Sequence, residues 1–337
     1  MTRIVNLAAA QMGPIAKLEP RADAVRRLIA MMREAKGRGA DVVVFPELAL
    51  TSFFPRWVID DEAELDAWFE REMPGSETRV LFEEAKELGI GFYLGYAELA
   101  MEGGRKRRFN TSIVVDKTAA IVGKYRKVHL PGHSEPQPER KFQHLEKRYF
   151  HPGDLGFPVW RAFGGIAGMC ICNDRRWPEV YRVMGLQGVE MVFLGYNTPI
   201  NHTLHADIDG LTQFHNHLSM QAGAYQNSTW VVGTAKCGNE EGSEMLGQSA
   251  IIAPSGEIVA MATSLEDEVI VARADLDMGR RYATTIFNLA AHREPESYRL
   301  IVERKGAIPP PPLPEEATPA TGAKEPAVKD RAGAMAR

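Results

Sequence analysis

The chain has 337 residues, of which 45% are hydrophobic and 25% charged, and its 40 Lys and Arg against 44 Asp and Glu give a net charge of −4. These values are typical of a globular protein, and the length excludes a small scaffold held together by disulfides. Without a dense basic block, the chain is not expected to have nucleic acid or an anionic membrane as its main partner. The basic run at residues 105–108 is interpreted as a solvated loop.

The three cysteines, Cys170, Cys172 and Cys237, cannot form a fully paired disulfide framework. An odd count in a long chain favours a reducing compartment, so the expected location is the cytoplasm. No stretch reaches the roughly 18–20 consecutive apolar residues that a membrane span requires. The apolar run at residues 4–10 is short and interrupted by Asn6, which argues against a signal peptide.

Short apolar runs alternate with longer amphipathic stretches, and this alternation predicts a layered α/β protein. The expected strands cover residues 4–10, 41–46, 90–97, 110–116, 119–124, 166–171, 189–194, 229–233, 248–253, 257–262 and 268–273. The expected helices cover residues 20–37, 62–72, 77–88, 177–187, 205–226 and 275–282. The strands at 41–46 and 189–194 are almost continuously apolar, which is typical of central strands buried on both faces.

From residue 306 the sequence is rich in Pro, Ala and Glu and almost lacks large apolar side chains. Such a segment cannot bury enough surface to offset its ordering entropy. We therefore expect one folded domain over residues 1–305 and a disordered tail over residues 306–337. Residues 110–122 resemble 247–259, and 39–45 resemble 188–193, which indicates two related α+β halves or a chance similarity of strand segments.

Residues 166–179 read as an apolar strand, a polar turn and a helix start. The strand ends at Cys172, and Pro178 stands where the first helical turn would begin. Such an elbow aims free backbone N–H groups at the side chain that ends the strand, so a nucleophile there gains an oxyanion site. Arg175, Arg176 and the helix N-terminus would each favour the thiolate of Cys172. Cys170 and Cys237 are interpreted as buried core thiols.

Two further segments carry candidate polar groups. Glu47 follows an apolar strand and Pro46, which restricts the preceding residue to an extended geometry and so fixes where the strand stops. A carboxylate beside an apolar wall suits proton transfer. In the segment Lys-Tyr-Arg-Lys-Val-His-Leu, alternation places Lys127 and His129 on one face of a strand. Each pattern alone would also fit an exposed loop or a solvated face.

Together, the Glu after a strand and Pro, the Lys in Lys-Tyr-Arg-Lys-Val-His-Leu and the Cys before Asn-Asp-Arg-Arg-Trp-Pro-Glu resemble the nitrilase superfamily of carbon–nitrogen hydrolases. The order Glu47, Lys127, Cys172 matches the Glu-Lys-Cys triad of that superfamily, and the resemblance covers residues 4 to 305. It implies a four-layer α-β-β-α sandwich of two pseudo-symmetric halves. It also implies a homodimer or homotetramer, and neither a metal nor another cofactor is expected.

Within the superfamily, the chain most resembles the N-carbamoyl-D-amino-acid hydrolases. The narrower match rests on residues 172–179, on Gly-Tyr-Asn-Thr-Pro at 195–199 and on the long insertion at 131–154. It implies hydrolysis of N-carbamoyl-D-amino acids to the D-amino acid, CO2 and ammonia, and the enantiomer preference rests wholly on this resemblance. The alternative is an amidase or nitrilase that acts on a different small amide, ureido compound or nitrile.

The chemistry of the triad follows from the residue types. A Cys172 thiolate can attack a ureido carbonyl, and Lys127 and the N–H of Asn173 can stabilise the resulting oxyanion. Glu47 is the natural base for the thiol proton, while the resemblance gives Glu146 an accessory role in holding Lys127. An accessible thiolate of low pKa would also be sensitive to peroxide.

Substrate recognition is expected to use a charged fork. Arg175 and Arg176 follow the nucleophile closely and could bind a substrate carboxylate. The resemblance adds further pocket-lining residues, namely His129, His144, Asn173, Asn197 and Thr198. The last two follow the strand at 189–194, so they should meet Cys172 at the sheet edge where open α/β folds bind ligands.

Two other classes of function deserve comparison. A metal-dependent amidohydrolase could use the histidines at 202, 205, 215 and 217, but their spacing matches no common zinc motif. A non-catalytic binding protein on the same fold is the second alternative. The presence of all three triad residue types at the expected places favours an enzyme.

Overall fold

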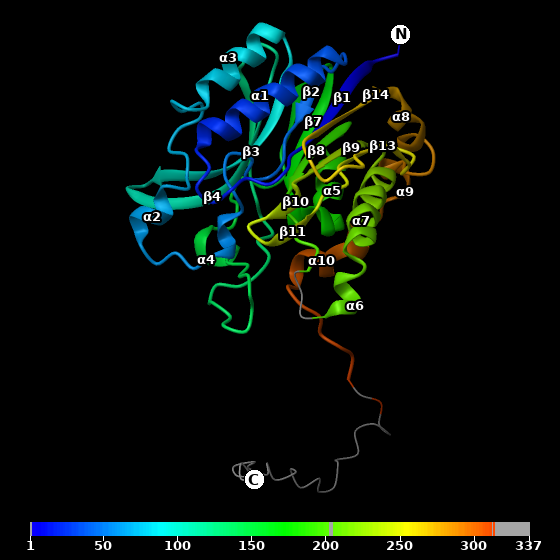
Figure 1. Ribbon diagram of the computed structural model, residues 1–337. Helices are drawn as coiled ribbons and strands as arrows, with labels where there is room; N and C mark the ends of the chain where they lie inside the picture. The colour runs from blue at the N-terminus through cyan, green and yellow to red at the C-terminus, as the bar shows by residue number, and fades with distance from the viewer. Residues whose placement is uncertain (1, 202–204, 312, 314–337) are drawn as a thin grey trace, which may run out of the picture. The chain divides into compact units, whose positions relative to one another are not determined.

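The computed structural model of the protein describes residues 2–201, 205–311 and 313 (Figure 1). The chain divides into two compact units, residues 1–292 and 293–337. In the second unit, the described residues form a 3-10 helix, η3 (Pro295–Tyr298), and helix α10 (Arg299–Glu303), followed by exposed chain without helix or strand. Most of the tail expected at 306–337 lies outside the described residues, and the domain boundary at 305 stays a prediction.

The first unit contains two six-stranded sheets that repeat one topology. In each sheet, three parallel strands lie at the centre. Two further strands extend the sheet on one side and one strand extends it on the other, and the strand next to the centre on either side is antiparallel to its neighbour. The first sheet has the order β14 (Glu268–Asp275), β1 (Ile4–Gln11), β2 (Val42–Val44), β3 (Gly91–Glu102), β4 (Arg105–Val115), β5 (Ile121–Arg126). The second has the order β13 (Ile258–Met261), β12 (Ala250–Ile252), β9 (Trp230–Ala235), β8 (Met191–Tyr196), β7 (Gly165–Ile171), β6 (Val159–Ala162).

This repeat explains the internal similarity of the sequence. Residues 110–122 belong to β4 and β5, and the similar residues 247–259 belong to β12 and β13, which hold the equivalent places in the other sheet. Likewise, residues 39–45 contain the central strand β2, and residues 188–193 contain the first half of the central strand β8. The two related halves expected from the sequence are confirmed.

Helices cover the outer faces of the two sheets. Helix α1 (Arg21–Gly37) buries residues three or four apart, Val25, Leu28 and Met32 among them, against the first sheet beside α3 (Arg79–Leu88). Helices α5 (Pro178–Gly185) and α7 (Thr212–Gln226) cover the second sheet. The result is the expected four-layer α-β-β-α sandwich, with the two helical layers on opposite sides of the strands in Figure 1.

The inner faces of the sheets meet in a core tied by a buried tyrosine. The Tyr93 hydroxyl of β3 donates to the Cys170 carbonyl of β7 and accepts from the backbone N–H of Gly195, both at 3.2 Å. The remaining elements are η1 (Phe54–Arg56), α2 (Glu62–Asp66), α4 (Glu146–Tyr149), η2 (Cys172–Arg176), α6 (Ala206–Asp209), β10 (Cys237–Glu240), β11 (Ser243–Leu246), α8 (Asp277–Ala283) and α9 (Leu289–His292). A search of the described helices for one with the length and apolarity to cross a bilayer finds none.

Most predicted elements are present within a few residues, and three predictions are wrong. The helix expected at 205–226 is interrupted between α6 and α7, and the one at 62–72 ends at Asp66. The short strands β6, β10 and β11 were not predicted, because each has only four residues and lacks a clear apolar run.

The third wrong prediction concerns the basic run at 105–108, which belongs to β4 and is not a solvated loop. Lys106 and Arg108 form ion pairs with Asp66 at 2.8 and 2.6 Å, and Arg107 pairs with Asp154 at 2.8 Å. These carboxylates lie about forty residues away in the chain. A run of like charge therefore looks solvated in the sequence, although tertiary partners pair with three of its four residues.

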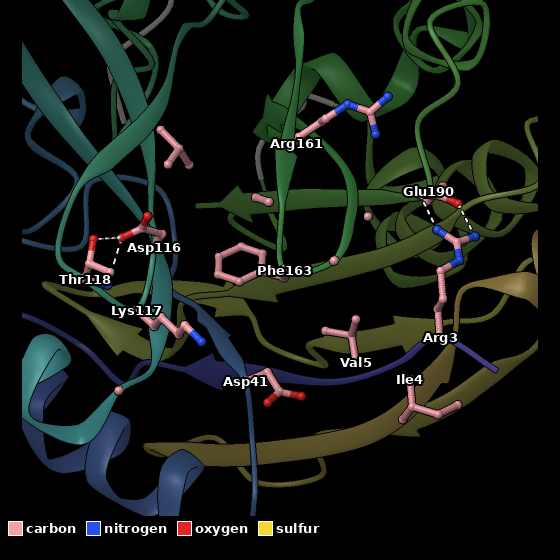
Figure 2. Close-up of a pocket in the computed structure, with 15 residues that line it drawn as sticks. Arg3, Ile4, Val5, Asp41, Asp116, Lys117, Thr118, Arg161, Phe163 and Glu190 are labelled. Carbon is pink, nitrogen blue, oxygen red and sulfur yellow. Dashed lines mark hydrogen bonds and ion pairs between the residues drawn. The ribbon is translucent and has the colours of Figure 1, made fainter. Parts of the chain in front are cut away.

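A cleft of about 680 Å³ opens between the sheets where the parallel strands begin (Figure 2). Its lining includes Arg3, Asp41, Phe163 and Glu190, and Figure 2 shows the ion pair between Arg3 and Glu190 on its wall. The predicted site residues follow the opposite, carboxyl ends of these strands. Since open α/β sheets bind ligands at carboxyl ends, we place the candidate active site there and not in this cleft.

Candidate active site

Glu47 is held between the two sheets by close backbone packing. The chain leaves β2 after Val44, and the Glu47 backbone then passes between Gly95 of β3 and Gly195 of β8. A Cβ atom on Gly95 would lie 2.8 Å from the Glu47 Cα, and one on Gly195 would lie 2.5 Å from the Glu47 nitrogen. Both glycines therefore let one strand from each sheet approach the segment that carries the carboxylate.

The Glu47 carboxylate is fully buried and accepts three hydrogen bonds. Its Oε1 accepts from Lys127 Nζ at 2.8 Å and from Asn110 Nδ2 at 2.7 Å, and its Oε2 accepts from the backbone N–H of Asn197 at 2.8 Å. The donors come from both sheets, so the carboxylate has one fixed orientation. A fixed carboxylate is suited to proton transfer at a neighbouring group.

Lys127 lies between two carboxylates and is itself fully buried. Its Nζ is 2.6 Å from Glu146 Oε2 in addition to its contact with Glu47. Burial favours a lower pKa for Lys127, but the charges of Glu146 and Glu47 outweigh it and raise the pKa overall. Burial likewise favours a higher pKa for Glu146, yet Lys127 and a hydrogen bond from His144 lower it. The ammonium and the Glu146 carboxylate are therefore both ionised.

Cys172 stands at a strained strand-to-helix turn. Strand β7 ends at Ile171, the turn η2 follows, and α5 begins at Pro178 as the sequence predicts. The backbone φ of Cys172 is +47°, a left-handed conformation that is uncommon for residues other than glycine. Such strain is typical of nucleophiles presented at a sharp turn.

Cys172 is only 3% exposed, which corrects the expectation of a solvent-accessible thiolate. Its Sγ lies 3.7 Å from the Asn197 carbonyl oxygen, 3.8 Å from Arg175 Nη1 and 3.9 Å from Thr198 Oγ1. Burial and the Glu47 charge raise the pKa of Cys172 above its usual value, and they outweigh the opposing charges of Lys127 and Arg175. The cations expected to favour the thiolate are present, but desolvation is the larger effect.

The arginine pair does not form a fork, because the two side chains point to different surroundings. Arg175 is buried, donates to the Cys172 carbonyl at 2.6 Å and to Thr198 Oγ1 at 3.0 Å, and lies 4.4 Å from the Tyr196 ring centroid. Arg176 is exposed and donates to Asn173 Oδ1 at 3.2 Å. Over the described part of the chain, no carboxylate pairs with Arg176.

The histidines expected in the pocket are anchored by carboxylates. His129 Nδ1 is 2.8 Å from Asp174 Oδ1, and the ring stacks on Trp177 with centroids 5.0 Å apart. His144 Nε2 is 3.1 Å from Glu146 Oε1, and its ring meets the Phe53 ring edge-on. Strand β5 ends at Arg126, so Lys127 and His129 lie beyond it and contact different groups, unlike the shared strand face expected.

The remaining predicted residues also gather at this edge of the sheets. Asn173 Nδ2 donates to the His129 carbonyl at 3.1 Å, and Asn197 Nδ2 donates to the Glu47 carbonyl at 2.9 Å. Thr198 follows Asn197 directly and faces Cys172. The structure thus brings the predicted triad, Glu146 and the predicted pocket residues to one edge of the sheets.

Two residues of this site were not predicted. Asn110 lies in the middle of β4 and donates to Glu47, and nothing in the strand pattern distinguishes it from a structural residue. Asp174 fixes the turn by accepting from the Ile171 N–H at 3.0 Å and from the Tyr125 hydroxyl at 2.8 Å. Its place next to the nucleophile was the only available signal.

No metal site was found in the part of the chain that the structure describes: no group of three or more His, Cys, Asp or Glu side chains there could hold an ion. His202, one of the four histidines considered as ligands, lies outside the described residues.

The family model of carbon–nitrogen hydrolases matches residues 6–284. The chain belongs to this family. It is 30% identical to N-carbamoylputrescine amidase of Solanum lycopersicum, over 91% of this chain and 98% of that one. It is 29% identical to a nitrilase of Pyrococcus abyssi, over 82% and 92% of the two chains. This carbon–nitrogen hydrolase is therefore an enzyme of the nitrilase superfamily that acts on amides.

Solved structures show the same fold. A carbon–nitrogen hydrolase from Helicobacter pylori G27 superimposes with a TM-score of 0.75 at 21% identity, covering 90% of this hydrolase and 99% of that chain. An amidase from Nesterenkonia sp. AN1, crystallised as a mutant with acrylamide added to its active-site cysteine, gives a TM-score of 0.66 at 19% identity, covering 88% and 98%.

Proposed function

We propose that this hydrolase cleaves small ureido compounds that carry a carboxylate, with N-carbamoyl amino acids as the substrate class. The observation that carries the proposal is the exposed Arg176 guanidinium, which lies four residues beyond Cys172 without a carboxylate partner among the described residues. A planar cation of this kind pairs well with a carboxylate.

The first half-reaction forms a thiocarbamate. Cys172 Sγ attacks the ureido carbonyl carbon, and its proton passes to Glu47. The oxyanion is stabilised by the Lys127 ammonium and by the N–H of Asn173. When the tetrahedral intermediate collapses, one C–N bond breaks, and the departing nitrogen takes the proton from Glu47.

The second half-reaction consumes one water. Glu47 removes a proton from water as its oxygen attacks the thiocarbamate carbon, and the C–S bond then breaks. The sulfur regains a proton, and the released carbamic acid decomposes to CO2 and the second nitrogen compound. The products are therefore the amino acid, CO2 and ammonia, and Glu146 serves to hold Lys127 throughout.

The relatives support the ureido class and raise a second candidate. N-carbamoylputrescine, the substrate named for several relatives, is a ureido compound with a terminal amine, and another relative, 31% identical over 58% of this chain, is a citrullinase from Francisella tularensis. An amine would be repelled by Arg176, whereas a carboxylate would be attracted. A neutral nitrile would gain nothing from this side chain.

The test compares kcat/KM for N-carbamoyl-D-phenylalanine, N-carbamoyl-L-phenylalanine and N-carbamoylputrescine by following ammonia release, with Cys172→Ala as the blank. We expect the carboxylate-bearing substrates to be preferred, and the D enantiomer over the L. Arg176→Leu should abolish the preference for the carboxylate. A higher kcat/KM for N-carbamoylputrescine would overturn the proposal in favour of the amine-bearing class.

We also propose that the protein assembles as a homodimer or homotetramer. Helix α7 and the residue before it expose Leu211, Phe214 and Leu218 at spacings of three and four, so these side chains lie along one side of the helix. Light scattering coupled to size-exclusion chromatography would reveal a monomer if this proposal is wrong.

A further inference from the structure

We propose that Glu240, Arg56 and Lys236 form a buried ionic hub that positions the three segments carrying Glu47, Glu146 and Asn197. These are positioning residues, since they act on the reaction through other side chains. The activity part of the argument rests on the proposed function.

Glu240 is the centre of the hub. All three side chains are buried, at 0%, 4% and 0% exposure. Glu240 Oε1 accepts from Arg56 Nη2 at 2.7 Å and from the Phe53 N–H at 2.8 Å. Its Oε2 accepts from Lys236 Nζ and from the Ile15 N–H, both at 3.1 Å. One carboxylate therefore receives four donors that come from three separate parts of the chain.

The first segment held by the hub is the loop that follows Glu47. Lys236 Nζ donates to the Thr51 carbonyl, and Glu240 binds the N–H of Phe53. Arg56 Nε donates back to the Phe53 carbonyl at 3.0 Å. These bonds hold residues 51–56, which follow Glu47 in the chain, and so limit how far Glu47 can move.

The second segment carries His144 and Glu146, and it is bound to the backbone beside Arg56. The Gln143 N–H donates to the Arg56 carbonyl at 3.1 Å, and the Leu145 N–H donates to the Pro55 carbonyl at 2.8 Å. A shift of the short helix η1 would therefore move Glu146, and with it the partner of Lys127.

The third segment is the chain after β8, which carries Asn197 and Thr198. The Lys236 N–H donates to the Tyr196 carbonyl at 3.1 Å. Glu240 is the last residue of β10, which pairs with β11 in a hairpin. In β11, the Leu246 N–H donates to the Thr198 carbonyl at 2.9 Å. The hub thus reaches the residues that lie within 4 Å of the Cys172 sulfur.

We attribute these three buried charges to the directional hydrogen bonds that they form, and not to a gain in stability. Removing ions from water is costly, and apolar side chains of similar size often stabilise a core as well or better. Burial lowers the pKa of Arg56 and of Lys236, because the charged form of each side chain is less stable away from water. Apolar contacts, however, are not directional, whereas hydrogen bonds to one carboxylate fix the distances between the segments they join.

The test uses two hub variants and one control. Glu240→Gln removes the central charge. Lys236→Met removes the bond to Thr51 and leaves the ion pair of Arg56 and Glu240, whose charges cancel, so this second variant should fold. Glu190→Gln is the control, since Glu190 also accepts from an arginine and a backbone N–H but lies at the opposite end of the strands. Each protein is assayed for kcat and KM and for the alkylation rate of Cys172 by iodoacetamide.

We expect kcat/KM to fall by about 10- to 10²-fold in both hub variants, mainly through kcat, because small displacements of reacting groups have effects of this size. The alkylation rate of Cys172 should change in the same variants, and Glu190→Gln should match the unmodified protein. A folded Lys236→Met with normal kcat/KM and normal alkylation overturns the proposal, whether or not Glu240→Gln folds. If the unmodified protein cleaves no ureido substrate, the proposed function fails, while the alkylation rates still test the hub.

Discussion

The backbones of Gly195 and Glu47 are in direct contact, so that a Cβ on the glycine would lie 2.5 Å from the Glu47 nitrogen. The contact joins β8 of one sheet to the segment that leaves β2 of the other. It brings the Asn197 N–H to the Glu47 carboxylate and places Asn197 beside the nucleophile.

Gly195→Ala should therefore reduce kcat/KM by about 10²-fold, because the added methyl group displaces the Glu47 backbone. The melting temperature should fall as well. Gly37→Ala is the matched control: a Cβ there meets no atom within 4 Å, and activity should not change. Normal activity of Gly195→Ala would show that the Glu47 position tolerates such a shift.

Cys172→Ala, Glu47→Ala and Lys127→Ala should each abolish turnover, measured as ammonia release. Their stabilities should differ. Lys127→Ala leaves Glu47 and Glu146 without their shared cation, which costs about 3–5 kcal/mol for a broken buried pair. Cys172→Ala should unfold at a urea concentration near that of the unmodified protein, and more than trace activity in it would contradict the mechanism.

Arg175→Leu and Arg176→Leu should have different kinetic effects. Arg176→Leu should raise KM for carboxylate-bearing substrates roughly tenfold with little change in kcat, as the loss of one charge-assisted contact does. Arg175→Leu should lower kcat and stability, because the Cys172 carbonyl and the Thr198 hydroxyl lose their donor. If Arg176 binds the substrate carboxylate, Arg176→Leu should have equal kinetics on the carboxylate and on a carboxamide analogue. An unchanged KM of Arg176→Leu for the carboxylate would contradict this role.

The raised pKa of Cys172 predicts a slow thiol in the resting enzyme. Alkylation by iodoacetamide should still be accelerating at pH 9, the ordinary thiol value, with no plateau near neutrality. Peroxide should inactivate slowly, contrary to the sensitivity expected from the sequence. Mass spectrometry assigns the modified residue, and Cys172→Ala serves as the control. A plateau below pH 7 would mean that the thiolate is already formed.

The Glu146 and Lys127 pair predicts how stability depends on pH. The pKa of Glu146 in the folded state lies below its ordinary 4.5, so its contribution is fully present above pH 4.5 and is lost as the pH falls through the folded value. The free energy of unfolding should therefore decrease below about pH 4.5, and less steeply in Glu146→Gln. Urea titrations between about pH 3 and 6 check this, and identical slopes would exclude Glu146 as a contributor.

Several features follow from local sequence alone. The apolar runs at 41–46 and 189–194 are central strands, since side chains in a parallel sheet are buried on both faces whatever their partners are. Pro178 and the polar turn before it locate the elbow at Cys172, because turn and helix-start chemistry involves only neighbouring residues. The resemblance of short segments then brought Glu47, Lys127 and Cys172 into one hypothesis.

Other features were decided by the tertiary structure. Asn110 supports Glu47 across the sheet, Arg175 points inward while Arg176 stays exposed, and three parts of the chain converge on Glu240. The sequence also could not show that Cys172 is buried enough for desolvation to outweigh its neighbouring cations. A chain's own pattern determines which segments are strands, helices and turns, because those depend on near neighbours. Which charges meet, and how much water they keep, depends on residues far apart in the chain and is settled only when the two sheets pack.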